Sequence, residues 1–108
     1  MNMNDYQREA LRTAGDPAAP GWLFEKLLGL PEECGEVLGV IKKAEFHGRP
    51  ADRDAIRKEL GDVLWYVATI AHWYGFDLGD VASTNVEKLR RRYPDGFSVE
   101  ASRNRGDE

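Results

Sequence analysis

Residues 53–74 read RDAIRKELGDVLWYVATIAHWY, and this stretch decides the fold class. Its apolar residues recur every three or four positions, at Ile56, Leu60, Val63, Leu64, Val67, Ile70 and Ala71. That period places them on one face of an α-helix. Asp52 or Asp54 is suited to cap the start of this helix, and Gly75 is suited to end it. The stretch therefore predicts a long amphipathic helix whose apolar face packs against other elements.

Three further segments on either side show the same helical period: residues 4–13, 22–46 and 78–92. Pro31 lies inside the second of them, where it predicts a kink or the start of a new helix. Asp77 is expected to cap the last one. Strand-type alternation is absent from the sequence. We therefore predict an all-α protein, an antiparallel bundle of four to five helices joined by short loops.

The chain has 108 residues, which is the size of one domain. We expect this domain to cover residues 1–97, followed by a polar and flexible tail over residues 98–108. Hydrophobic residues make up 42% and charged residues 31%, which is an ordinary globular composition and excludes a disordered or fibrous chain. A domain this small buries a limited share of its surface, so self-association is expected.

The charge balance bears on partners and location. With 15 basic and 19 acidic side chains the formal net charge is -4, which argues against a nucleic-acid polymer as partner. No apolar run approaches the ~18 residues of a membrane span, so no membrane association is predicted. The N-terminus lacks the pattern of a signal peptide, and the single Cys34 has no partner for a disulfide. These features predict a cytoplasmic protein.

Five acidic residues fall into two short runs at helical spacing: Glu32, Glu33 and Glu36 in one, Glu59 and Asp62 in the other. Residues three apart on a helix have Cβ atoms ~5–6 Å from each other, so each run places carboxylates together. The segment between the runs is long enough for a helix end, a turn and a helix start, so the two helices are antiparallel neighbours. Converging carboxylates repel one another unless a cation lies between them, and oxygen ligands favour Mg²⁺ or Mn²⁺.

Two alternatives to this cation site exist. The acids could form a solvated helix face, which is the ordinary place for charged side chains. A carboxylate di-iron bundle would need Glu-x-x-His on two helices, and no Glu of this sequence has His three residues later. The iron alternative is thereby disfavoured.

The sequence resembles the MazG-like, all-α nucleoside triphosphate pyrophosphohydrolases over about residues 3–97. The matching features are Gly29-Leu30, the E-E-x-x-E and E-x-x-D runs, VLWY at 63–66 and NVEKLRRRYP at 85–94. Pro31 departs from the family pattern, which has a helix former there. The same superfamily contains dimeric dUTPases and phosphoribosyl-ATP pyrophosphohydrolases, so the motifs indicate the chemistry better than the substrate.

The resemblance implies a Mg²⁺ site, with Mn²⁺ as the other candidate ion, whose ligands are Glu33, Glu36, Glu59 and Asp62. Glu32 would orient or deprotonate the attacking water, or only support the ligands. Asn85 and Lys88 match the part of the family's C-terminal helix that faces the triphosphate. Arg92 is a further candidate cation, although a basic residue there also complements the helix dipole. For stacking on the base, Tyr66 is the first candidate and Trp22 the second, and packing is an alternative role for each.

The reaction implied by the resemblance is the hydrolysis of a nucleoside triphosphate, NTP or dNTP, to a monophosphate and pyrophosphate, for clearance of non-canonical nucleotides. Phosphoribosyl-ATP or dUTP hydrolysis is the alternative within the superfamily, and a non-catalytic helical oligomerisation module is the alternative outside it. The resemblance also implies a homodimer or a homotetramer.

Overall fold

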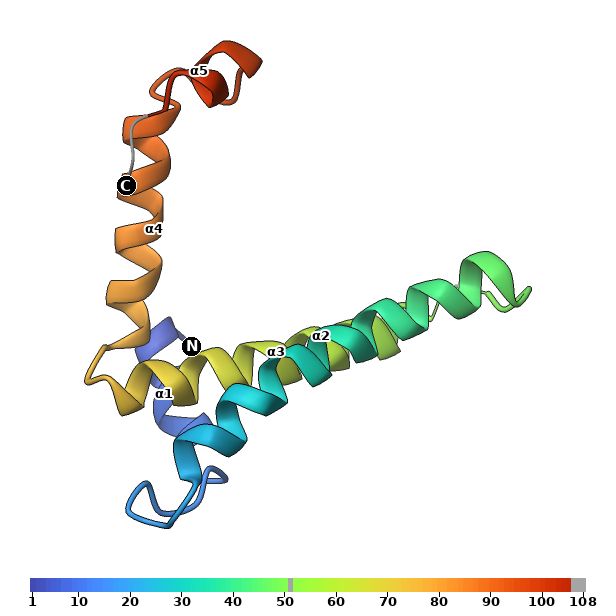
Figure 1. Ribbon diagram of the computed structural model, residues 1–108, viewed down its shortest axis with the longest axis vertical. Helices are drawn as coiled ribbons and strands as arrows, with labels where there is room; N and C mark the ends of the chain where they lie inside the picture. The colour runs from blue at the N-terminus through green and yellow to red at the C-terminus, as the bar shows by residue number, and fades with distance from the viewer. Residues whose placement is uncertain (51, 106–108) are drawn as a thin grey trace.

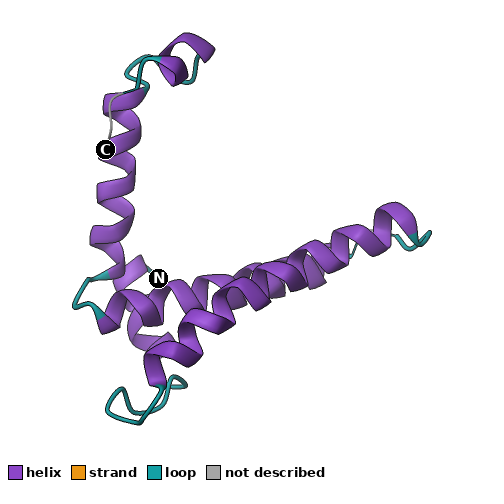
Figure 2. Cartoon of the chain, viewed as in Figure 1, coloured by secondary structure: helices purple, strands orange, loops and turns teal. Residues whose placement is uncertain are grey.

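Five helices form the part of the chain that the computed structural model describes, residues 1–50 and 52–105. In chain order they are α1 Met3–Leu11, α2 Trp22–Phe46, α3 Arg53–Trp73, α4 Leu78–Arg92 and α5 Val99–Arg103. Figure 2 shows helices and loops alone over these residues. The predicted all-α class and helix number are therefore confirmed.

Helix α2 is one continuous helix in spite of Pro31. Proline removes one backbone hydrogen bond within a helix, that of the carbonyl four residues earlier at Leu27. Both Leu27 and Pro31 lie on the exposed side of α2, so the proline ring does not disturb a packed interface. Of the two possibilities expected at Pro31, a kink or a new helix, the new helix is therefore excluded, and Glu33 and Trp22 lie on the same helix.

Helices α2 and α3 lie side by side as a long antiparallel hairpin, and α1 crosses its end (Figure 1). The core lies at this crossing, where Ala10 of α1, Ala68 of α3 and Leu78 of α4 are buried together. Ala68 is fully buried because its small side chain lets the neighbouring helices come close. The hairpin is thus anchored at one end only.

The N-terminus of α4 is held by side chains of α1. Asn4 Oδ1 accepts a hydrogen bond of 2.8 Å from the Gly79 N–H, and Gln7 Oε1 accepts one of 3.0 Å from the Leu78 N–H. These are the orphan donors that a helix start leaves free. Asp77, which we expected to cap α4, makes no side-chain capping bond. Helix α4 is capped by residues of α1, far away in the sequence, because the helix crossing buries Gln7 beside the start of α4.

Beyond this capped end, α4 runs away from the hairpin as a separate arm (Figure 1). The radius of gyration is 17.1 Å, whereas a compact domain of about 100 residues has ~13 Å. Large apolar side chains therefore remain exposed on the hairpin and on the arm, among them Leu28, Leu38, Leu60, Val86 and Leu89. The single chain does not pack α4 alongside α2 and α3 as a closed bundle would.

The short α5 falls within the predicted tail, of which residues 106–108 lie outside the described residues.

Candidate metal centre

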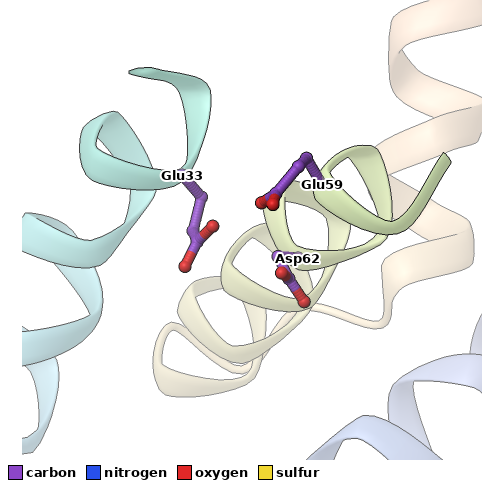
Figure 3. A group of neighbouring side chains, drawn as sticks. All are labelled: Glu33, Glu59 and Asp62. Carbon is purple, nitrogen blue, oxygen red and sulfur yellow. The ribbon is translucent and has the colours of Figure 1, made fainter. Parts of the chain in front are cut away.

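Three carboxylates converge between α2 and α3. Glu33 comes from α2, and Glu59 and Asp62 come from successive turns of α3. One carboxylate oxygen from each lies within 4.8 Å of the others. Figure 3 shows Glu33 on one side of the group and Glu59 and Asp62 on the other, with the Glu59 side chain directed toward Glu33. The structure thus brings together three of the four residues that the family resemblance makes metal ligands.

The proximity of these acids affects the protonation of Glu33. Partial burial between the helices raises the pKa of the Glu33 carboxyl, and the negative charges of Asp62, Glu59 and Glu32 raise this pKa further. A carboxylate surrounded by like charges binds protons more tightly. A cation at this position would relieve the repulsion, so the chemistry of the site fits a hard divalent ion held by oxygen ligands.

The other two acids of the first run do not join this group. Glu32 and Glu36 are both exposed. Glu32 is nevertheless near enough for its charge to raise the pKa of Glu33 and of the Tyr66 phenol. Glu36 is the predicted ligand that the structure does not bring to the three.

Tyr66 borders the acids from α3. Its ring lies against the backbone of Gly29 on α2, so closely that a Cβ at Gly29 would overlap the ring. Burial raises the pKa of the Tyr66 phenol, as do the charges of Glu33, Glu32 and Glu25. The predicted base-stacking residue thus borders the candidate metal centre, with its ring partly covered by Gly29.

Tyr6 of α1 also lies near enough to be affected by the charge of Asp62, although it was not among the residues predicted from the sequence. Burial raises the pKa of the Tyr6 phenol, and the charge of Asp62 raises it further. The side chain packs against the core at the helix crossing. Its position depends on how α1 crosses the hairpin, so no local sequence pattern indicates it.

Lys26 is the second residue missed from the sequence. It is 3% exposed, and its Nζ lies 4.7 Å from the Trp22 ring centroid and 5.5 Å from that of Trp65. The ammonium donates a hydrogen bond of 2.7 Å to Glu25 Oε1. Aromatic faces attract a cation at such distances. The sequence does offer one indication, because Lys26 lies four residues after Trp22 and seven before Glu33 on the same face of α2.

Trp22 itself is 5% exposed. Its ring stacks on Trp73 at a centroid distance of 5.7 Å, and its Nε1–H donates a hydrogen bond of 2.6 Å to the Ala14 carbonyl. Of its two suggested roles, the structure therefore shows packing, with no open ring face for a base.

The candidate phosphate-binding residues lie on α4, away from the acids of the same chain (Figure 1). Asn85 is exposed, whereas Lys88 and Arg92 are partly buried. The Arg92 Nε is buried without a hydrogen-bond partner in the described part of the chain. The structure thus separates the predicted site into an acidic part on the hairpin and a polar and basic part on the arm.

Comparison with known proteins gives a consistent result. Residues 25–97 match the family model of the MazG nucleotide pyrophosphohydrolase domain. The Gene 37 protein of Mycobacterium phage L5 is 33% identical over 114 residues, which cover 97% of this chain and all of that protein. The YvdC protein of Bacillus subtilis (strain 168) is 33% identical over 86 residues, covering 68% of this chain and 81% of that one.

A third relative carries an activity in its name. The nucleoside triphosphate pyrophosphohydrolase of Escherichia coli (strain K12) is 36% identical over 77 residues, or 68% of this chain. The matched part is 27% of that longer protein. No solved structure matches the chain. Within the described residues, every helix is too short or too polar to cross a membrane.

Proposed function

The chain belongs to the MazG nucleotide pyrophosphohydrolase family, and from this we propose that it hydrolyses nucleoside triphosphates to monophosphates and pyrophosphate with Mg²⁺. The observation that carries the proposal is the convergence of Glu33, Glu59 and Asp62 inside the segment that matches the family. Mn²⁺ is the alternative ion, since it takes the same oxygen ligands. Non-canonical nucleotides are the proposed substrates.

In the proposed reaction, water attacks the α-phosphorus and a new P–O bond forms. The bond from this phosphorus to the oxygen that bridges to the β-phosphate breaks, and pyrophosphate leaves with the electron pair. A divalent ion bound by Glu33, Glu59 and Asp62 would neutralise phosphate oxygens and lower the pKa of a water. Glu32, exposed beside these ligands, would orient the water and accept its proton. Glu36 would turn in as a further ligand when the ion is present.

The ion is needed for binding as well as for the chemical step. A triphosphate is a polyanion, and the hairpin presents several carboxylates where it would bind. Without a cation, the two would repel each other. The ion reverses the sign of the local charge, so an acidic protein can bind an acidic substrate.

The polar and basic part of the site comes from a second copy of the chain in this proposal. Asn85, Lys88 and Arg92 lie on an arm that leaves its own hairpin at the crossing. A homodimer, or a homotetramer built from it, would place this arm beside the partner's acids and cover the exposed apolar side chains of both. Lys88 would then stabilise the leaving pyrophosphate, and Tyr66 would contact the base.

A nucleotide panel with Mg²⁺ tests this proposal. Canonical and modified NTPs and dNTPs, dUTP and phosphoribosyl-ATP are incubated with the wild-type chain and with Glu33→Gln, and products are separated by HPLC. We expect metal-dependent release of a monophosphate by the wild type and little release by Glu33→Gln. No turnover of any compound would favour the non-catalytic module, and turnover of phosphoribosyl-ATP or dUTP alone would assign the narrower activity.

A further inference from the structure

Gly29 and Tyr66 make an unusually close contact between α2 and α3. A Cβ built on Gly29 would overlap the Tyr66 ring atoms Cε1 and Cζ and lie 2.7 Å from the phenol oxygen. The ring therefore occupies the space that a side chain at position 29 would fill. Gly29 is buried, as expected for a position covered by an aromatic ring.

The contact lies one helical turn from the acids on both helices. Gly29 precedes Glu33 by four residues, and Tyr66 follows Asp62 by four. Because α2 and α3 are antiparallel, two pairs of residues follow each other along the same interface. The first pair is Gly29 and Tyr66, and the second is Glu33 and Asp62. Whatever sets the helix separation at the first pair also sets it at the second.

Tyr66 has little freedom to move aside. Its ring packs edge-on against Trp65 with centroids 4.9 Å apart. The Trp65 Nε1–H is held by hydrogen bonds of 3.0 Å to the Ala10 carbonyl and to Thr13 Oγ1. The contacts of Trp65 with α1 therefore help to hold the Tyr66 ring in its place against Gly29.

We propose that Gly29 is a positioning residue for the metal centre: its missing side chain leaves room for the Tyr66 ring, so that α2 and α3 approach to the separation at which Glu33 reaches Glu59 and Asp62. This inference rests on the proposed function, because it assumes that the three acids hold a divalent ion. A methyl group at position 29 would have to push the ring and α2 apart by about 1.5 Å before ordinary carbon contact distances are restored. Glu33 would move with α2 away from the two acids of α3.

Binding of Mn²⁺ to the chain tests the proposal without any substrate. It is measured by calorimetry and by the loss of the EPR signal of the free ion. We expect Gly29→Ala to bind Mn²⁺ roughly 10–100-fold more weakly than wild type, the effect typical of residues that orient ligands. Adding Tyr66→Ala to Gly29→Ala should restore most of the affinity, since the ring is gone. Adding Tyr66→Phe should not, because the overlapping ring carbons remain.

Gly39→Ala is the matched control, since a Cβ there meets nothing within 4 Å. This variant is on the same helix and should bind Mn²⁺ like the wild type. Helix content and oligomeric state are recorded for all variants. If Gly29→Ala does not fold, the double variant with Tyr66→Ala decides: Mn²⁺ binding supports the proposal, and its absence overturns it.

The experiment distinguishes failure of the metal centre from failure of the positioning role of Gly29. A wild-type chain that binds no Mn²⁺ would contradict the metal centre, and with it both the proposed function and the role of Gly29. A wild type that binds the ion, with Gly29→Ala binding it equally well, would overturn the positioning role and leave the proposed function intact.

Discussion

Glu33 of α2 and Asp62 of α3 face each other across the helix interface with carboxylate oxygens within 4.8 Å. No basic residue forms an ion pair with either of them among those found in the described part of the chain. Two acids this close oppose folding when both are ionised, because folding brings like charges together. A protein keeps such a pair where the function gains from it, and here a divalent cation is the partner that would turn repulsion into binding.

The raised pKa of Glu33 gives a prediction on stability against pH in the absence of metal. The pKa of this carboxyl is higher in the folded state than its ordinary value of 4.5, so the folded state binds its proton more tightly. This contribution to stability is present below pH 4.5 and is lost as the pH rises through the folded-state pKa. In EDTA, we expect Glu33→Gln to have a higher melting temperature than wild type at pH 7, and a smaller difference at pH 4.5.

Glu45→Gln provides the control, since Glu45 is exposed on α2. It should leave the pH profile of the wild type unchanged. A wild type and Glu33→Gln that melt in parallel from pH 4.5 to pH 7 would mean that the acids do not interact as the structure indicates.

Metal binding should raise the stability of the wild type. At 100 times its dissociation constant, an ion that binds only the folded state adds about 2.7 kcal/mol to the free energy of unfolding. For a domain of this size that is a rise in melting temperature of roughly 10 °C or more. We expect this rise with Mg²⁺ or Mn²⁺ for the wild type and for Glu45→Gln, and little or none for Asp62→Asn. An equal rise for Asp62→Asn would place the bound ion elsewhere.

Gln7 should be important for the stability of the helix crossing. Its side chain donates hydrogen bonds of 3.1 Å to the Ala68 and Phe76 carbonyls and accepts one from the Leu78 N–H. Gln7→Leu would leave these buried groups without a partner, at about 1–3 kcal/mol for an unsatisfied group. We expect urea denaturation to show a loss of this size or more.

The comparison variant for Gln7 is Arg12→Ala on the same helix. Its ion pair with Glu9 is exposed, so its removal should change the free energy of unfolding by less than about 1 kcal/mol. Equal effects of the two substitutions would contradict the role given to Gln7.

Subunit mixing tests whether the arm of one copy completes the site of another. In the proposed dimer, Asp62→Asn should inactivate the hairpin part of the site and Lys88→Ala the arm part, so a heterodimer of the two variants would contain one intact site. Coexpression in equal amounts should then give about a quarter of the wild-type activity, well above either variant alone. Coexpressed Asp62→Asn and Glu59→Gln should give none, because both changes affect the hairpin. Equal activity of the two mixtures would contradict the shared site.

The sequence predicts the helices and the acids better than their relations in space. The apolar period of residues 53–74 is local, and the helix that it predicts is confirmed by α3. The spacing of Glu59 and Asp62 is local too, and the structure places their carboxylates close together. Burial of Lys26 depends on Trp65, far along the chain, and the cap of α4 depends on Gln7. Such contacts arise only when helices cross, so they leave no periodic pattern. The inward turn that we propose for Glu36 would require a bound cation, and the sequence indicates a cation only through the acidic residues themselves.

The products of nucleoside triphosphate hydrolysis show directly which phosphoanhydride bond the protein cleaves. The wild-type chain is incubated with its best substrate and Mg²⁺, and the reaction is followed by ³¹P NMR, with Glu33→Gln in parallel. We expect nucleoside monophosphate and pyrophosphate in equal amounts from the wild type, and a strong loss of the hydrolysis rate in Glu33→Gln. Nucleoside diphosphate with orthophosphate, or an unchanged rate in Glu33→Gln, would contradict it.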